Sequence, residues 1–209
     1  MAARLGPVAE RIARLPLPIR GRRVVLALPS ADQTAAYVRL LNDPQVQQGT
    51  LRLPFPYTEK DARTWVRRAG RERKAGRSLG LQVVRRSDGQ LLGGVGLHQF
   101  EETFARAEVG YWLGREYWGE GYATEAVNLV VRTAFARLGL HRIEARIYPW
   151  NVASRRVARR CGFRYEGRLR DEVRKDGRWR STLLYSRLAS DPAPRRAQRH
   201  ERKHRSAQT

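Results

Sequence analysis

Two closely spaced glycines, Gly119 and Gly121, separate a strand-like segment from a helix-like segment. Apolar residues alternate over residues 109–113, as in a half-buried strand, and recur at helical spacing over residues 126–138. A strand-to-helix junction of this kind directs free backbone N–H groups and the positive end of a helix dipole at one point, and small residues let an anion approach closely. The sequence therefore predicts either a phosphate-binding loop or a simple turn before a helix.

This segment differs from two well-known phosphate loops. The loop of nucleotide hydrolases requires a lysine directly after its last glycine, and no lysine follows Gly121. The dinucleotide-binding fingerprint requires a third glycine, where this chain has Thr124, and an acidic residue at a strand end, whereas Glu144 lies in mid-strand. The sequence favours neither class of nucleotide-binding protein.

The segment from Trp118 to Ala126 reads Trp-Gly-Glu-Gly-Tyr-Ala-Thr-Glu-Ala and resembles the acetyl-coenzyme A loop of the GNAT superfamily of N-acetyltransferases. Together with the Glu-Val-Gly-Tyr-Trp-Leu strand of residues 108–113, it is similar to the branch that contains the ribosomal-protein alanine N-acetyltransferases. The Gln or Arg of the family pattern falls on Glu116 here, and Arg115 lies one place earlier. This departure concerns a side-chain contact and leaves the backbone cradle intact.

The resemblance implies that acetyl-coenzyme A is the co-substrate. Residues of the strand and the loop are the implied coenzyme contacts: Trp112, Leu113, Trp118, Gly119, Glu120, Gly121, Tyr122 and Ala123. No metal is expected, because the four histidines show no paired ligand spacing.

A second motif begins at Asn151 and continues through Ser154 to Gly162-Phe163 and Glu166-Gly167, matching the Asn-x-x-Ser pattern of the same branch. From their residue types alone, Asn151 and Ser154 are helix-capping residues. By resemblance, Asn151 holds the pantetheine arm and Ser154 lies near the coenzyme sulfur, where it could protonate the departing thiolate. Arg155 either contacts coenzyme phosphates or faces water.

Glu108 is the leading candidate for the general base, because strand alternation places it on the same face as Gly110 and Trp112. It could equally be a strand carboxylate paired with an arginine, and Glu166 is the second candidate. A glycine in mid-strand, such as Gly110, predicts a bulge or a close backbone approach. In the resembled family a bulge here separates this strand from its successor, so backbone N–H groups of residues 110–112 are expected to stabilise the oxyanion. No activated nucleophile is evident, which favours direct attack by the amine.

The elements that position these residues follow from periodicity and capping signals. Helices are expected over residues 8–15, from the Ser30–Gln33 capping box to Leu41, over 59–74 with Thr58 as cap, after Gly121, and over 152–161. Strands are expected over residues 23–28, 79–85, 91–98, 107–113, 142–148, 163–170 and 180–188, with turns at Asp88-Gly89 and Asp176-Gly177. The predicted fold is α+β of GNAT type, with a mixed, mostly antiparallel sheet of six to seven strands and helices on both faces.

Length and composition set the organisation. A chain of 209 residues with 41% hydrophobic residues can bury one core, so we expect an N-terminal extension at 1–20, one acetyltransferase domain at 21–190 and a disordered basic tail at 191–209. The apolar runs are too short to span a bilayer and none suits a signal peptide, which predicts a cytoplasmic protein. Cys161 is the only cysteine, which excludes a disulfide within the chain and suits a small buried side chain at a helix end better than a reactive thiol.

The formal net charge of +22 comes almost entirely from arginine. Such a charge attracts nucleic acid, ribosomes or other acidic partners. Because arginines occur in every segment, a preference for arginine codons with a solvated surface explains most of them. The tail after Asp191 is the exception, and it could contact RNA or an acidic surface.

Three classes of function remain open. The first is N-acetylation of a protein N-terminus, of the ribosomal-protein type. The second is acetylation of a small amine such as an amino acid, a polyamine or an antibiotic, although the positive charge disfavours polyamines. The third is a non-catalytic module that binds RNA or ribosomes on the same fold. A homodimer agrees with the resemblance, but no residue argues for one.

Overall fold

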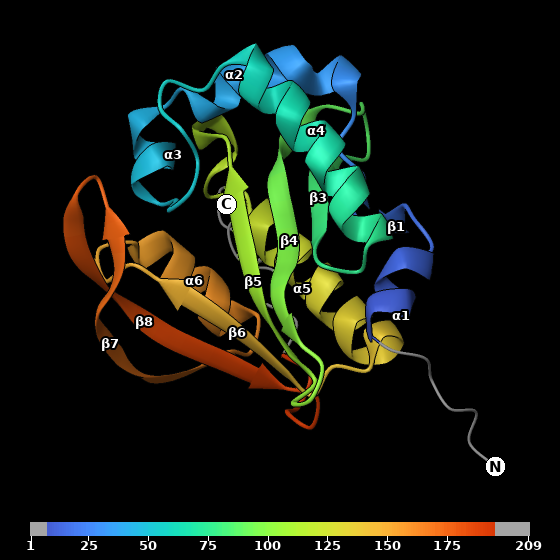
Figure 1. Ribbon diagram of the computed structural model, residues 1–209, viewed down its shortest axis with the longest axis vertical. Helices are drawn as coiled ribbons and strands as arrows, with labels where there is room; N and C mark the ends of the chain where they lie inside the picture. Colours follow the sequence, from blue (N-terminus) through green and yellow to red (C-terminus); the bar gives the residue numbers. More distant parts are fainter. Residues whose placement is uncertain (1–7, 195–209) are drawn as a thin grey trace, which may run out of the picture.

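The computed structural model describes residues 8–194, in which eight strands form one sheet in the order β1-β2-β3-β4-β5-β6-β8-β7 (Figure 1). Neighbouring strands are antiparallel except β5 and β6, which are parallel. The strands are β1 (Ile19–Arg20), β2 (Val24–Ala27), β3 (Leu79–Arg85), β4 (Leu91–Glu101), β5 (Arg106–Leu113), β6 (Arg142–Ile147), β7 (Arg164–Lys175) and β8 (Arg178–Leu188). The mostly antiparallel α+β fold is therefore confirmed. The sheet has eight strands where six to seven were predicted, and the sequence did not indicate the two-residue β1.

The helices cover both faces of the sheet. They are α1 (Val8–Arg14), η1 (Ala31–Gln33), α2 (Thr34–Leu41), α3 (Pro44–Gln48), α4 (Glu59–Lys74), η2 (Arg115–Tyr117), α5 (Tyr122–Thr133), η3 (Ala134–Leu138) and α6 (Val152–Arg160). In Figure 1, α2 and α4 lie over one face and α5 lies behind the other. None of the helices in the described part of the chain is long and apolar enough to cross a membrane.

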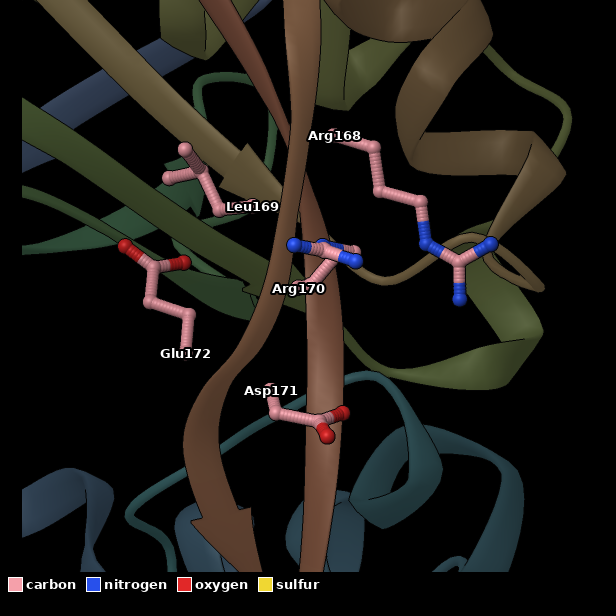
Figure 2. Close-up of a pocket in the computed structure, with 5 residues that line it drawn as sticks. All are labelled: Arg168, Leu169, Arg170, Asp171 and Glu172. Carbon is pink, nitrogen blue, oxygen red and sulfur yellow. The ribbon is translucent and has the colours of Figure 1, made fainter.

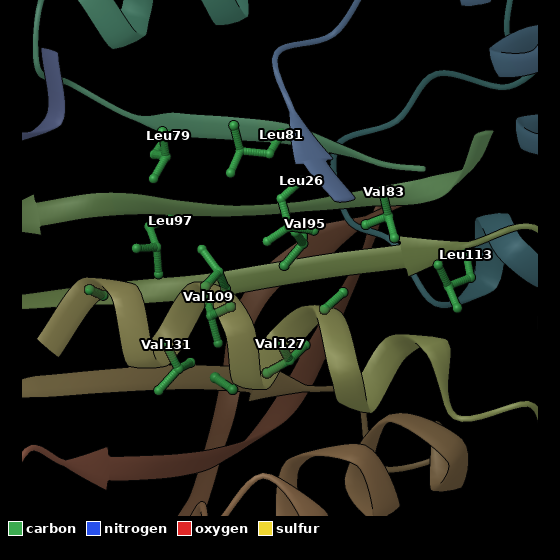
Figure 3. Packing of buried hydrophobic residues seen from close by; sticks show 14 of the residues in the cluster. Leu26, Leu79, Leu81, Val83, Val95, Leu97, Val109, Leu113, Val127 and Val131 are labelled. Atoms are coloured by element: carbon green, nitrogen blue, oxygen red, sulfur yellow. The ribbon is translucent and has the colours of Figure 1, made fainter. Parts of the chain in front are cut away.

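The main core lies between the sheet and α5. Figure 3 shows Val127 and Val131 of α5 beside apolar side chains of the central strands. Alternate residues of β3 point to this side, and Leu79, Leu81 and Val83 are almost fully buried there. Their neighbours on the opposite face meet α2 and α4, and a Cβ atom added at Gly80 would lie 2.4 Å from the Trp65 ring of α4. Because both faces of β3 and β4 are covered, these strands read as continuous apolar runs.

The first helix is part of this packed unit. Val8, Ile12 and Leu15 are buried, and Ile12 has no exposed surface. Helix α1 contacts α4 and η3, so the segment predicted as an extension contributes to the core from residue 8 onward. Residues 1–7 of that extension and residues 195–209 of the predicted basic tail lie outside the described residues.

Two predicted helix starts had different outcomes. Thr58 caps α4, and its capping box with Asp61 is complete, as the sequence predicted. The capping box predicted at Ser30 was wrong, because Ser30 makes no capping bond and its hydroxyl instead donates to Asp32. A 3-10 turn therefore precedes α2. The Asp176-Gly177 turn is confirmed, since both residues have the positive φ angles, 50° and 74°, that a tight hairpin requires.

Strands β5 and β6 diverge where the active site is expected. Their parallel pairing ends at Glu108 and Glu144. Of the two features predicted at Gly110, a bulge or a close backbone approach, the bulge is not found, because β4 and β5 pair without interruption from Gly93 to His98 and the register shift lies beyond His98. Gly110 instead makes room for a side chain: a Cβ atom there would lie 3.1 Å from Nε2 of His98.

Candidate active site

The loop between β5 and α5 is held in a conformation that requires its two glycines. Gly119 and Gly121 have φ angles of 84° and 80°, a region that residues with a Cβ atom rarely adopt. Gly121 precedes α5, and its carbonyl accepts the first helical hydrogen bond, from the N–H of Glu125. Trp118 closes the loop by donating its indole N–H to the carbonyl of Leu113 at 2.9 Å.

The backbone N–H groups of residues 119–124 are free. Within the described residues 8–194, no protein group accepts a hydrogen bond from any of them. They stand at the N-terminus of the twelve-residue helix α5, where the helix dipole is positive. A Cβ atom at Gly119 would meet no atom within 4 Å, so the space beside the loop is open. The arrangement is that of an anion-binding site.

Arg23 and Glu125 fix the loop from behind. The Arg23 guanidinium donates to the carbonyl of Glu120 at 3.1 Å and lies 4.7 Å from the ring centroid of Tyr122. The Glu125 carboxylate accepts bonds from the backbone N–H and from Nε of Arg23, at 2.6 and 3.0 Å. Burial alone would raise the pKa of Glu125, but these hydrogen bonds outweigh it and lower the pKa. A charged Glu125 thus ties the start of β2 to the first turn of α5.

The other residues discussed for the coenzyme site take different positions relative to the loop. Leu113 is buried in the core, which leaves its backbone as the group near the loop. Trp112 points to the other face of the sheet, where its ring centroid lies 6.2 Å from that of Tyr37. Glu116, at the position of the family's Gln or Arg, is bound to Arg39 at 2.5 Å. Its carboxylate is therefore already occupied by an ion pair.

Asn151 caps α6, as its residue type alone predicts. Its side-chain oxygen accepts the N–H of Ser154 at 3.0 Å. The hydroxyl of Ser154 lies 2.7 Å from the Tyr111 hydroxyl of β5, so α6 is linked to the strand that carries Glu108. Arg155 donates to the carbonyl of Pro149 at 3.3 Å.

A cavity of about 840 Å³ opens on the face of the sheet that α2 and α4 cover. Its walls come from α2, the α3–α4 connection, α4 and the sheet from β3 to β8. Glu108, Gly110 and Trp112 line it together, as strand alternation predicted, and Tyr111 joins them. Lys175 bridges the β7–β8 hairpin to the end of α3 and the α3–α4 connection by donating to the carbonyls of Gln47 and Thr50, at 3.2 and 2.6 Å.

Glu108 lies inside this cavity with only 14% of its side chain exposed. One carboxylate oxygen is 2.5 Å from Nη1 of Arg146, and the other is 4.0 Å from Nε2 of His98. Burial raises the pKa of the Glu108 carboxyl, and the Arg146 guanidinium opposes this only in part. The residue is therefore both an ion-paired carboxylate and a cavity-lining group with an enhanced affinity for protons.

A family model described as an acetyltransferase (GNAT) domain matches residues 23–164. The chain belongs to the GNAT acetyltransferase family. A relative named uncharacterized N-acetyltransferase p20, from Bacillus licheniformis, is 30% identical over 168 residues, which are 80% of this chain and 92% of the relative. The chain is accordingly an N-acetyltransferase that uses acetyl-coenzyme A.

Two solved structures have the same fold as this GNAT domain. Mycobacterium smegmatis RimJ in complex with CoA-disulfide matches with a TM-score of 0.74 and 26% identity, covering 79% of this chain and 82% of that one. A Vibrio cholerae protein, provisionally described as a ribosomal-protein-serine acetyltransferase, matches with a TM-score of 0.73 and 26% identity, covering 82% and 97%. The free N–H groups of residues 119–124 fit the coenzyme, because its pyrophosphate needs several hydrogen-bond donors.

Several charged or titratable residues in the acetyltransferase cavity were not identified from the sequence. Among them are His98, Arg146 and Glu172. His98 belongs to an apolar strand, and only the pairing of that strand with β5 brings it opposite Glu108. Arg146 shares a strand face with Glu144, a spacing of two that could have suggested an ion pair.

Glu172 reaches Arg146 because β7 is irregular. The pairing of β7 with β8 shifts between Leu169 and Val173, and Asp171 has a φ angle of 47°. This segment lines a surface pocket of about 580 Å³. Figure 2 shows Leu169 and Glu172 on the side of the strand opposite to Arg168. Glu172 accepts a bond from Nε of Arg146 at 2.7 Å. No local sequence signal predicts this contact.

Glu166, the second candidate for the general base, lies outside the cavity of the acetyltransferase. Its carboxylate accepts a hydrogen bond from Arg142 at 2.8 Å and is also bonded by Ser186. The bond from Arg142 lowers the pKa of Glu166 to about 2. A carboxylate of such low basicity is a poor proton acceptor near neutral pH, which favours Glu108 over Glu166 as the general base.

Cys161 is fully buried at the end of α6, as predicted. Burial raises the pKa of its thiol to about 12, which leaves it unreactive near neutral pH. Among the described residues, no group of three or more His, Cys, Asp or Glu side chains is arranged to hold a metal ion.

Proposed function

We propose that this acetyltransferase acts on the N-terminal amine of a protein, of the ribosomal-protein type. The position of Glu108 carries the proposal. Its partly buried carboxylate lies in a cavity of about 840 Å³, beside the point where β5 and β6 diverge. A cavity of this size accommodates the first residues of a peptide chain. The description of the Vibrio cholerae protein as a ribosomal-protein-serine acetyltransferase supports the same acceptor class.

The loop residues hold the coenzyme in this proposal. The free N–H groups of residues 119–124 bind its pyrophosphate at the N-terminus of α5. Asn151 and Ser154, which begin α6, contact the pantetheine arm, and Arg155 lies beside them. When bound, the coenzyme supplies an acetyl thioester next to the gap between β5 and β6.

The backbone of β5 supplies the oxyanion donor. Gly114 donates to the carbonyl of Leu92 on β4, so alternation directs the N–H groups of residues 108, 110 and 112 toward β4. The N–H of Tyr111 then points into the gap that β6 leaves open. A donor preorganised in this way stabilises the negative charge that develops on the thioester carbonyl oxygen.

Glu108 and Ser154 manage the protons. Glu108 takes a proton from the acceptor's ammonium group, and its raised pKa suits that task. Ser154 relays a proton toward the departing sulfur through its hydroxyl, which the Tyr111 hydroxyl orients at 2.7 Å. The cavity walls orient the amine and exclude water, which adds to the rate by holding the reactants together.

A panel of acceptors tests the proposal. Acetyl-coenzyme A turnover is followed by release of free thiol, with Ser- and Ala-starting peptides, the same peptides blocked at the N-terminus, and small amines including an amino acid, a polyamine and an aminoglycoside. We expect turnover only with the free peptides, and mass spectrometry should place the acetyl group on the α-amine. Turnover restricted to small amines would overturn the protein N-terminal assignment and move the activity to metabolite or antibiotic acetylation.

A further inference from the structure

His98 faces Glu108 across a gap within the cavity. The two residues are paired opposite each other on β4 and β5. Nε2 of His98 lies 4.0 Å from the Oε1 atom of Glu108, a distance too long for a direct hydrogen bond. Two polar atoms at such a separation are suited to a third polar atom that bonds to both.

The site is shaped so that the imidazole can occupy this position. Gly110 lies on the same face of β5 as Glu108, and a Cβ atom there would approach Nε2 to 3.1 Å. A larger residue at position 110 would therefore displace the ring. Within the described residues, Nδ1 of His98 is buried and has no hydrogen-bond partner. An unsatisfied ring nitrogen costs stability, a cost that an apolar side chain at position 98 would avoid.

Burial and two neighbouring positive charges keep the ring neutral. Burial lowers the pKa of His98 to about 4, and the positive charges of Arg52 and Arg146 act in the same direction. The ring therefore does not form an ion pair with Glu108 near neutral pH. Arg52 belongs to the α3–α4 connection, Arg146 to β6, and Glu172 to β7 on the same cavity wall. No contact at Nδ1 fixes the tautomer, so Nε2 can accept a hydrogen bond.

We propose that His98 is a catalytic residue, and that its Nε2 atom and the Glu108 carboxylate together grip the ammonium group of the acceptor. The inference rests on the proposed function, because it assigns a residue within the same acceptor site. The acceptor must therefore carry a protonated primary amine, whether it is a peptide or a small molecule.

The transfer step removes two protons from the acceptor nitrogen. One ammonium N–H donates to Nε2 of His98, which holds the nitrogen, and the first proton to leave the nitrogen passes to Glu108 and from there to solvent. The freed lone pair forms the new N–C bond at the thioester carbonyl. The electron pair of the broken C–S bond leaves with sulfur, and the second proton lost from nitrogen neutralises the thiolate. His98 ends the step unchanged.

The test compares His98→Gln, which keeps a polar group near the Nε2 position, with His98→Leu, which fills the ring volume without one. The exposed His141 provides the matched control, His141→Gln. Each protein is assayed with acetyl-coenzyme A and whichever acceptor the wild type acetylates, a Ser-starting peptide or a small amine. Coenzyme A affinity by calorimetry and the melting temperature are measured in parallel.

We expect His98→Leu to lower kcat/KM for the acceptor about 100-fold, with a raised acceptor KM and coenzyme A affinity within about twofold of wild type. His98→Gln should recover part of the acceptor KM, and His141→Gln should match wild type. A kcat/KM for folded His98→Leu within about twofold of wild type would overturn the inference. If His98→Leu fails to fold, His98→Gln decides by the same criterion, with a smaller loss of about tenfold expected. An enzyme that acetylates only small amines would refute the protein N-terminal acceptor and leave this comparison valid.

Discussion

The guanidinium of Arg146 lies 2.5 Å from the carboxylate of Glu108 and spans the gap that opens between β6 and β5. The same guanidinium is 2.7 Å from Glu172 and 3.0 Å from Glu144. The charge of Glu108 is thus set by a cation that other carboxylates share. The basicity of Glu108 therefore depends on each of these neighbouring charges.

Neutral substitutions of Arg146 and of Glu172 should shift the pKa of Glu108 in opposite directions. Arg146→Gln removes a positive charge that favours the carboxylate, so the acid limb of the kcat/KM profile should shift upward by roughly one pH unit. Glu172→Gln removes a negative charge that disfavours it, so the limb should shift downward. The measurement is the pH dependence of kcat/KM with a Ser-starting peptide. Shifts of the same sign in both variants would contradict the assignment.

Substituting a glycine of the coenzyme loop should have an effect on binding that substituting a glycine of an ordinary turn does not have. Gly119→Ala and Gly89→Ala both introduce a Cβ atom at positive φ, 84° and 75°, with no atom within 4 Å. Each should cost about 1–2 kcal/mol of unfolding free energy. Only Gly119→Ala should also weaken coenzyme A binding, by about tenfold or more in calorimetry. Equal coenzyme affinity in the two variants would mean that residues 119–124 do not hold the pyrophosphate.

Ser154 and Tyr111 should act as one unit. Because their hydroxyl groups are 2.7 Å apart, Ser154→Ala and Tyr111→Phe interrupt the same proton path. We expect each to lower kcat by roughly tenfold, and the double variant to lose little more, since the effects of coupled residues are not additive. The acceptor KM should change little. Independent, multiplying losses in kcat would argue against the shared path.

The neutral state of His98 predicts how stability depends on pH. Because its pKa falls from 6.5 to about 4 on folding, the unfolded chain binds a proton in this window that the folded chain does not. The contribution of His98 to stability is therefore complete above about pH 6.5 and is lost as the pH falls toward 4. Urea unfolding between these limits should show a shallower pH slope for His98→Gln than for wild type. An NMR titration midpoint of His98 close to 6.5 would refute this.

Local signals accounted for much of the fold. The Thr58 capping box and the Asp176-Gly177 turn involve residues a few positions apart, so their geometry is largely set by neighbours in sequence. The Ser30 signal had the same form but failed, because the side chain of Asp32 captured the serine hydroxyl. Helix α3 was not predicted, although Asp43 and Pro44 are a capping residue and a first-turn proline that together suit a helix start.

The candidate site likewise has features that the sequence predicts and features that it does not. The glycine loop and the face of Glu108 follow from periodicity within one segment. The partners of Glu108 do not, since His98 and Arg146 reach it through strand pairing, and Glu172 reaches Arg146 through a distortion of β7. The glycine at position 110 signalled a close approach correctly. The group that approaches Gly110 is the His98 ring, and the strand has no bulge there. Only the register of β4 against β5 reveals this contact.

The most direct measurement is the rate of thiol release from acetyl-coenzyme A with a Ser-starting peptide, for wild type, Glu108→Gln and Glu166→Gln. Glu108 lies in the cavity with a raised pKa, whereas Glu166 is bound to Arg142 outside it. We expect a loss of about 100-fold or more in kcat/KM for Glu108→Gln, unchanged coenzyme A affinity, and near wild-type turnover for Glu166→Gln. Equal activity in the two variants, or a loss confined to Glu166→Gln, would contradict the role of Glu108 as the general base.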